Sequence, residues 1–229
     1  MAFISQRYRF LFVMSPRTGC TSIAYGVIVP HLEGCRVPWK DIVDEGGRLL
    51  VDSKHSTVPD LLYYGLVSEE DVQGLFKVCA VRNPFDSLVS LFVKSQTTYA
   101  KLVDDPSSFL HKKPNALEDV RGAADATFSE WVKNRYVPSG SRGSRLRTLR
   151  PRHMYERYMK RVDHIMRFER LLDDLDEVLA KIGAPTGLEL ANINPTPRDK
   201  DYRPYYTDEA REIVERVFKP DLERFGYKF

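Results

Sequence analysis

Residues 10–22 read Phe-Leu-Phe-Val-Met-Ser-Pro-Arg-Thr-Gly-Cys-Thr-Ser, and this stretch decides the fold. Its first five residues form an apolar run that is typical of a buried strand. Ser-Pro closes the run, Gly19 permits a tight turn, and residues 21–29 have the pattern of a helix that Pro30 is expected to end. The stretch therefore predicts a strand, a loop and a helix in direct succession.

The same succession recurs along the chain. Each further apolar run is followed by polar residues and then by a helical pattern, and the runs cover residues 48–52, 76–81 and 164–168. Strands that alternate with helices predict a parallel sheet covered on both faces, within a single domain that spans residues 1–229. Residues 95 to about 125 show no sustained period and are expected to form a surface segment outside the core.

The composition narrows the function classes. With 229 residues, 42% of them hydrophobic, and a net charge of +3, the chain is expected to be globular and not a general nucleic-acid binder. Its apolar runs are far shorter than the roughly 18 to 20 residues that span a bilayer. The N-terminal residues lack a secretory cleavage pattern, and the three cysteines have no CxxC spacing. We therefore expect a cytoplasmic protein with no membrane span and no metal site.

The loop at residues 15–22 has the chemistry of an anion cradle. Gly19 lets the backbone approach a ligand, the following helix presents unpaired N–H groups, and Thr18, Thr21 and Ser22 add hydroxyl donors. A tight turn with a hydroxyl cap explains the loop equally well. The first glycine and the lysine of GxxxxGK[ST] are missing, which disfavours a Walker-type NTPase with bound magnesium.

Three segments, in the right order, resemble sulfotransferases that use 3′-phosphoadenosine 5′-phosphosulfate (PAPS). Residues 16–22, PRTGCTS, resemble the family's 5′-phosphosulfate loop, PKxGTTW or PKTGSTS. Residues 81–92, VRNPFDSLVSLF, are similar to the 3′-phosphate motif VRNPYDRLVSAY, with the same spacing from Arg82 to Ser90. Residues 53–59, SKHSTVP, resemble the KTHLP segment that supplies a general base. The likeness extends to residues 167–172 and 202–227 and leaves about 95–160 unplaced.

The resemblance implies a P-loop-like three-layer sandwich, PAPS as the donor, and a hydroxyl-bearing acceptor such as a carbohydrate or a hydroxylated small molecule. It makes His55 the general base with Lys54 assisting, and Arg17 the cation that stabilises the leaving oxygen. Its implied donor contacts are Arg17, Thr18, Gly19, Cys20, Thr21, Ser22, Arg82, Ser90, Phe168 and Arg203.

Two of these positions depart from the family pattern. Arg17 replaces a lysine of many members, although some carbohydrate branches also carry arginine there. Ser22 replaces a tryptophan that stacks on adenine in cytosolic members, so the resemblance leaves Phe168 to contact the base.

Other readings of the sequence stay open. A P-loop small-molecule kinase and an inactive nucleotide- or glycan-binding module are the alternatives, and the sequence does not indicate an oligomeric state. Residues 135–161 carry nine Lys and Arg and one acid, a charge of +8 against 3 − 8 = −5 for the rest. This segment is either a solvated face or an anion-binding wall toward the donor or an anionic acceptor. In the second case Arg142, Arg145, Arg147, Arg150 and Arg152 would line an acceptor channel.

Overall fold

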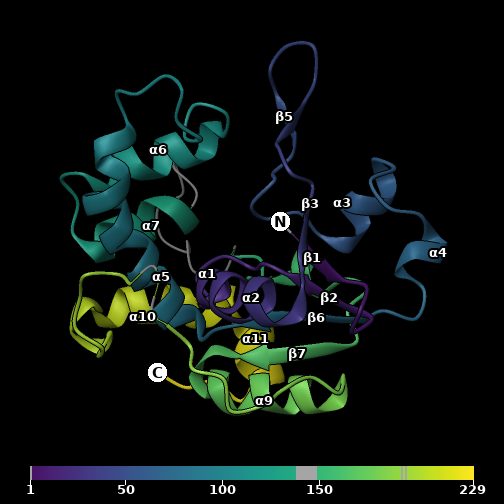
Figure 1. Ribbon diagram of the computed structural model, residues 1–229. Helices are drawn as coiled ribbons and strands as arrows, with labels where there is room; N and C mark the ends of the chain where they lie inside the picture. The colour runs from purple at the N-terminus through teal and green to yellow at the C-terminus, as the bar shows by residue number, and fades with distance from the viewer. Residues whose placement is uncertain (1, 138–148, 192, 194) are drawn as a thin grey trace. The chain divides into compact units, whose positions relative to one another are not determined.

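The computed structural model describes residues 2–137, 149–191, 193 and 195–229, and the chain forms two compact units (Figure 1). Unit 1 comprises residues 1–82 and 155–195, and unit 2 comprises residues 83–154 and 196–229. Among the described residues, all strands belong to unit 1, whereas the regular elements of unit 2 are helices.

A five-stranded sheet forms the centre of unit 1, in the order β3-β1-β2-β6-β7. Strands β2, β6 and β7 run parallel, and β1 pairs antiparallel with both β2 and β3. The fold is therefore mixed α/β, as the sequence predicts, with its parallel strands side by side. The strands are β1 (Ala2–Ser5), β2 (Phe10–Val13), β3 (Cys35–Val37), β6 (Phe76–Val81) and β7 (His164–Arg167).

Strand β2 is buried on both faces of this sheet. Phe10, Phe12 and Met14 belong to the hydrophobic core of unit 1, and Leu11 and Val13, which alternate with them, are equally inaccessible. The core residues pack with apolar side chains of the helix that follows the loop and of α9 (Leu171–Lys181), which runs along β7 in Figure 1. An uninterrupted apolar run is what a strand covered on both faces requires.

The helix after the loop is longer than predicted. It begins as α1 (Cys20–Ile23), continues through a π-helical segment (Ala24–Ile28) and ends as α2 (Val29–Leu32). Pro30 does not end it, which corrects the expectation. Proline falls in the first turn of α2, where its missing N–H is tolerated, and the hydrogen-bond pattern has already shifted, since Val29 donates to Ala24.

The second predicted strand lies outside the main sheet. β5 (Leu49–Val51) pairs only with β4 (Ile42–Val43), in a two-stranded antiparallel hairpin that extends away from the sheet (Figure 1). The place beside β2 is taken instead by β1, which the sequence analysis did not predict. The expectation of a parallel strand here was wrong because β5 is short and its Leu50 is partly exposed.

Local capping signals set two of the smaller helices of unit 1. Capping boxes start α3 at Thr57 and α4 at Ser68. Each hydroxyl accepts from the backbone N–H three residues later, and the aspartate at that position accepts from the backbone N–H of the capping residue. These two helices are α3 (Val58–Tyr63) and α4 (Glu69–Val72), whereas α8 (Glu156–Met159) and the 3₁₀ turn Phe168–Arg170 have no side-chain cap.

Unit 2 has its own core of helices, rich in aromatic side chains. The segment after residue 95 is not a plain surface excursion, because it contains a helix and because Leu110, Val120 and Ala123 are buried. The helix Asp208–Val217 ends before Pro220, which lies in the first turn of the next helix, Lys219–Phe225. The elements are α5 (Pro84–Lys94), a π-helical segment (Ser95–Tyr99), α6 (Pro114–Ala123), α7 (Phe128–Tyr136), α10 (Asp208–Val217), α11 (Lys219–Phe225) and 3₁₀ turns at Ala100–Leu102 and Arg203–Tyr205.

Cysteines occur only in unit 1. Cys20 and Cys79 are buried, Cys35 is exposed, and none is in a disulfide. In the described part of the chain, no helix has the length and apolar character needed to cross a bilayer.

Candidate active site

Three parallel strands of unit 1 end side by side, and each leads directly into a predicted site residue. β2 leads into the loop that contains Arg17, β6 into Arg82, and β7 into Phe168. The register pairs Val81 with Arg167, so Arg82 and Phe168 leave neighbouring strands at the same level. This carboxyl edge is where open α/β sheets bind ligands.

Hydrogen bonds fix the loop between β2 and α1 from within. The Ser15 hydroxyl donates to the carbonyl of Ala80 on β6 and also accepts from its N–H (3.3 Å). Thr18 is fully buried and donates its hydroxyl proton to the Ser15 carbonyl (2.9 Å). In this structure the Thr18 hydroxyl therefore stiffens the loop. Ser15 was missed by the sequence analysis, and its only signal was a small polar residue at a strand end.

Gly19 is the residue on which the loop turns into the helix. It is the N-cap of α1 and has a φ of 71°, in the left-handed region that favours glycine. A Cβ there would lie 2.8 Å from Leu171 Cδ2 and 3.4 Å from Phe168 Cε2. Arg17 also has a positive φ of 69°, a conformation that a non-glycine residue adopts rarely.

Arg82 and Phe168 lie against each other and against this loop. The Arg82 guanidinium donates from Nη1 to the carbonyl of Arg17 (3.0 Å), and its carbon lies 3.9 Å from the centre of the Phe168 ring. Arg82 is also largely buried. The structure thus brings together Arg17, Gly19, Arg82 and Phe168, which the sequence analysis had assigned to one donor site. The Arg82 guanidinium also covers one face of the Phe168 ring.

His55 is held at the end of β2 by its ring. Nδ1 lies 2.8 Å from the Met14 carbonyl oxygen, and because a carbonyl can only accept, Nδ1 carries the hydrogen. Nε2 is then the nitrogen with a free lone pair. Burial lowers the pKa of His55 to about 3, with the nearby Lys54 charge acting in the same direction and Asp52 opposing it. His55 is therefore neutral at pH 7.

Two further groups of unit 1 surround this histidine. Lys54 is exposed, and its backbone N–H donates to the Asp52 carboxylate (2.9 Å). The Tyr158 ring meets the His55 ring edge-on at 6.4 Å, and burial raises the pKa of Tyr158 to about 12. Tyr158 lies far from the motif in sequence, so nothing in the pattern could have found it.

The remaining loop residues lie on α1. Cys20 is buried, and burial raises the pKa of its thiol, which keeps the sulfur unreactive. Thr21 is half-buried, and the Ser22 hydroxyl accepts from the backbone N–H of Ile193 (3.2 Å), which leaves its own proton to donate.

Ser90 and Arg203 belong to unit 2. Ser90 is buried on α5, with its hydroxyl 2.9 Å from that of Thr196, a partner that the sequence analysis missed. Arg203 is exposed and its guanidinium pairs with Asp201 (3.3 Å).

Several cations of the basic segment 135–161 are paired with carboxylates inside their own unit. The described pairs are Arg135 with Asp119, Arg157 with Asp60, Lys160 with Glu156 and Arg161 with Glu69. Of the arginines assigned to an acceptor channel, Arg150 and Arg152 are exposed, and Arg142, Arg145 and Arg147 lie outside the described residues.

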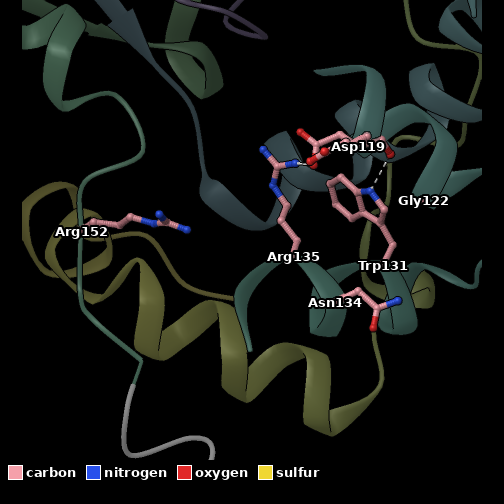
Figure 2. A pocket seen from close by; sticks show the side chains of 7 residues that line it. Asp119, Gly122, Trp131, Asn134, Arg135 and Arg152 are labelled. Atoms are coloured by element: carbon pink, nitrogen blue, oxygen red, sulfur yellow. Dashed lines mark hydrogen bonds and ion pairs between the residues drawn. The ribbon is translucent and has the colours of Figure 1, made fainter. Parts of the chain in front are cut away.

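A cavity of about 420 Å³ in unit 2 contains none of the predicted donor-site or catalytic residues, but Arg152, which the sequence analysis assigned to an acceptor channel, lines it (Figure 2). Figure 2 shows the Arg135 guanidinium paired with Asp119, and the Trp131 indole N–H donating to the Asp119 backbone carbonyl (3.2 Å). Its walls carry both acidic and basic groups, so the cavity lacks the single sign of charge that would favour an anion.

The fold and the loop of unit 1 define a class of protein. A glycine-hinged loop between a central strand and a helix, with two arginines at the carboxyl edge of parallel strands, is the arrangement of P-loop-like α/β proteins that bind phosphate or sulfate groups. The family model described as "Sulfotransferase family" matches residues 1–228, and the chain belongs to this family. No curated protein and no solved structure gave a match. Family membership supports sulfotransfer activity in general and confirms the predicted P-loop-like fold.

Proposed function

We propose that the protein transfers the sulfuryl group of PAPS to a hydroxyl of an acceptor. The single observation that supports this donor best is the contact of Arg82 with the Arg17 carbonyl and the Phe168 ring, which holds a cation beside the phosphosulfate-like loop. Two arginines, a helix start and the Ser22 hydroxyl form a donor set that suits a ligand with several phosphate and sulfate charges. PAPS supplies an activated sulfuryl group and leaves as the 3′,5′-bisphosphate.

The residues of the site divide the remaining work. Arg17 stabilises negative charge on the leaving oxygen, and the backbone of residues 18–22 holds the 5′-phosphate. Arg82 and Ser90 bind the 3′-phosphate, Phe168 contacts adenine through the part of its ring that Arg82 leaves open, and Arg203 adds a donor contact. His55 accepts the acceptor's proton at Nε2, with Lys54 nearby. We also propose that residues 1–229 form one sulfotransferase domain, since the family model spans both units.

The first test is donor binding without turnover. Calorimetry should detect binding of 3′-phosphoadenosine 5′-phosphate in the absence of metal. Binding of ATP with magnesium should be much weaker. The reverse preference would favour the kinase alternative. Donor binding with no transfer of labelled sulfate to any acceptor would favour the inactive binding module.

Arg82→Ala should weaken binding of 3′-phosphoadenosine 5′-phosphate by tenfold or more, because a charge-assisted contact contributes about 1.5 to 3 kcal/mol. Arg7→Ala is the matched control, since Arg7 is an exposed arginine of the same unit that pairs with Glu33. Equal affinity of the Arg82 variant and the control, both folded, would contradict the assignment of the 3′-phosphate site.

A further inference from the structure

β3 and the segment that follows it, residues 35–41, are attached to Ser53 and Ser56, which lie on either side of His55 in the sequence. The position of residues 35–41 is therefore fixed relative to the proposed base, although these residues belong to none of the motifs that resemble the family. Three hydrogen bonds make the attachment: Arg36 Nη2 to Ser53 Oγ (2.9 Å), the Ser53 N–H to Asp41 Oδ1 (2.9 Å), and Ser56 Oγ to the Val37 carbonyl (3.3 Å).

Trp39 stands out on this attached segment. Its side chain is 71% exposed, whereas Trp131, the other tryptophan, is 2% exposed in the core of unit 2. The exposed indole therefore offers a flat apolar face to a ligand ring. The Arg36 guanidinium lies 5.6 Å from the centre of the Trp39 ring, so the aromatic face and the cation form one surface.

Arg36 forms no ion pair with a carboxylate among the described residues. Its Nη2 donates to the Ser53 hydroxyl, and its buried Nε has no hydrogen-bond partner. Other arginines of unit 1 do have carboxylate partners, as Arg157 has in Asp60 and Arg161 in Glu69. A guanidinium that lacks a carboxylate partner suits the anionic group of a ligand.

We propose that Arg36 and Trp39 bind the acceptor and determine which acceptors are used. Trp39 packs on the flat face of an acceptor ring, and Arg36 pairs with a carboxylate or sulfate on that ring, while His55 takes the proton of its hydroxyl. The inference rests on the proposed function, because it names the acceptor class of the same site. Two ring chemistries share these features: an acidic sugar and a hydroxyaryl acid.

Four probes test the surface, in pairs that differ in charge. Methyl glucuronide is compared with methyl glucoside, and 4-hydroxybenzoate with 4-hydroxybenzamide, each as acceptor for labelled PAPS. Wild type should show a lower KM for the acidic member of at least one pair, and that pair identifies the ring chemistry.

Arg36→Gln should raise the KM of that acidic acceptor about tenfold and leave the KM of the neutral acceptor unchanged. Trp39→Ala should raise the KM of both about tenfold. In both variants kcat should stay within about twofold, because neither residue acts on the proton.

Two further variants separate recognition from structure. Tyr63→Ala removes an aromatic side chain that is 83% exposed in the same unit and should change no KM. Ser53→Ala removes the hydrogen bond to Arg36 but keeps the guanidinium, and the preference for the acidic acceptor should survive. The exposed Trp39 adds a readout without turnover, since a bound ring should protect its fluorescence from quenching by iodide.

Unchanged KM values in both the Arg36 and Trp39 variants would overturn the proposal. So would equal KM values for the acidic and neutral members of both pairs, or the failure of all four probes to be sulfated or to shield Trp39. Binding of 3′-phosphoadenosine 5′-phosphate is measured in parallel. If it remains dependent on Arg82, only the acceptor inference fails; if it is absent in wild type, the proposed function fails.

Discussion

His55 is fixed in one tautomer by a single backbone carbonyl. The bond to Met14 places the hydrogen on Nδ1, and burial keeps the ring neutral, so Nε2 carries the unshared electron pair at any pH near neutrality. The resemblance to the family implied that His55 is the general base, and this role stays a prediction. The motif could not indicate the tautomer or the shifted pKa, because Met14 is 41 residues away along the chain.

His55→Gln should lower turnover about 100-fold or more while the affinity for 3′-phosphoadenosine 5′-phosphate stays within about threefold, since general-base catalysis contributes about 10² to 10⁴. Glutamine can keep a hydrogen bond to Met14 but cannot take up the proton. Steady-state kinetics and calorimetry on the same preparation separate the two effects. A complete loss of donor affinity would instead mark His55 as a donor ligand or as a structural residue.

The same histidine should make the protein less stable in acid. Its pKa is about 3 in the folded state and about 6.5 when unfolded, so between these values the unfolded chain binds one more proton. Stability therefore falls as the pH drops below about 6.5, and the contribution from pH 7 to pH 5 is about 2 kcal/mol. Urea unfolding at both pH values should show a smaller loss for His55→Gln than for wild type. His31→Gln, at an exposed position, should match wild type; an equal loss in all three proteins would contradict the burial of His55.

At the scale of elements, the turn from β2 into α1 depends on glycine twice. Gly19 supplies the left-handed φ, and its lack of a side chain makes room for Leu171 and Phe168. The sequence predicted the turn from the glycine itself. It did not predict the close approach, because Leu171 comes from a helix about 150 residues later in the chain.

Gly19→Ala should destabilise unit 1 more than Gly65→Ala does. Both glycines have a positive φ, so both substitutions should cost about 1 to 2 kcal/mol of backbone strain. A Cβ at Gly65 meets open space, whereas at Gly19 it meets Leu171 and should add about 1 to 3 kcal/mol. Chemical denaturation of the two variants measures the difference. Equal losses would show that the loop is not packed as described.

Elements that are decided locally depend on residues close by in the sequence, and elements decided by distant partners do not. The helices that start at Thr57, Ser68 and Thr127 carry their own capping residues. β1 is four residues long, and its burial depends on pairing with β2 and β3. β5 has the same kind of short apolar pattern but finds only β4 as a partner. A short apolar run therefore predicts a strand without predicting its sheet.

For the whole molecule, the charge is uneven along the chain, and this bears on the acceptor. The sequence places five arginines between residues 142 and 152, but it cannot say which face they line. If they guide an anionic acceptor, its KM should rise steeply as salt screens the attraction. A variant with Arg145, Arg147 and Arg150 changed to glutamine should lose most of that salt dependence. Equal acceptor kinetics of variant and wild type at low and moderate salt would show that these arginines form a solvated face and do not guide the acceptor.

The motifs assigned residues from three separate strand ends to one donor site, and that assignment stays a prediction. Arg82 and Phe168 were assigned to one donor site, and the register of β6 and β7 explains why they meet. For the acceptor, the sequence analysis singled out the arginines between residues 142 and 152, and not Arg36 or Trp39. Arg36 lies in the edge strand β3 and Trp39 just after it, and no motif indicates that the fold attaches this strand to Ser53 beside His55.

The distribution of cysteines gives the molecule a built-in chemical reporter. Unit 2 contains no cysteine at any position, and of the three thiols of unit 1 only that of Cys35 is open to solvent. A maleimide added to the native protein therefore modifies one thiol quickly, and the other two react only when unit 1 opens. The rate at which the second and third labels appear measures the opening of the sheet and its loop alone, whatever the helices of unit 2 are doing.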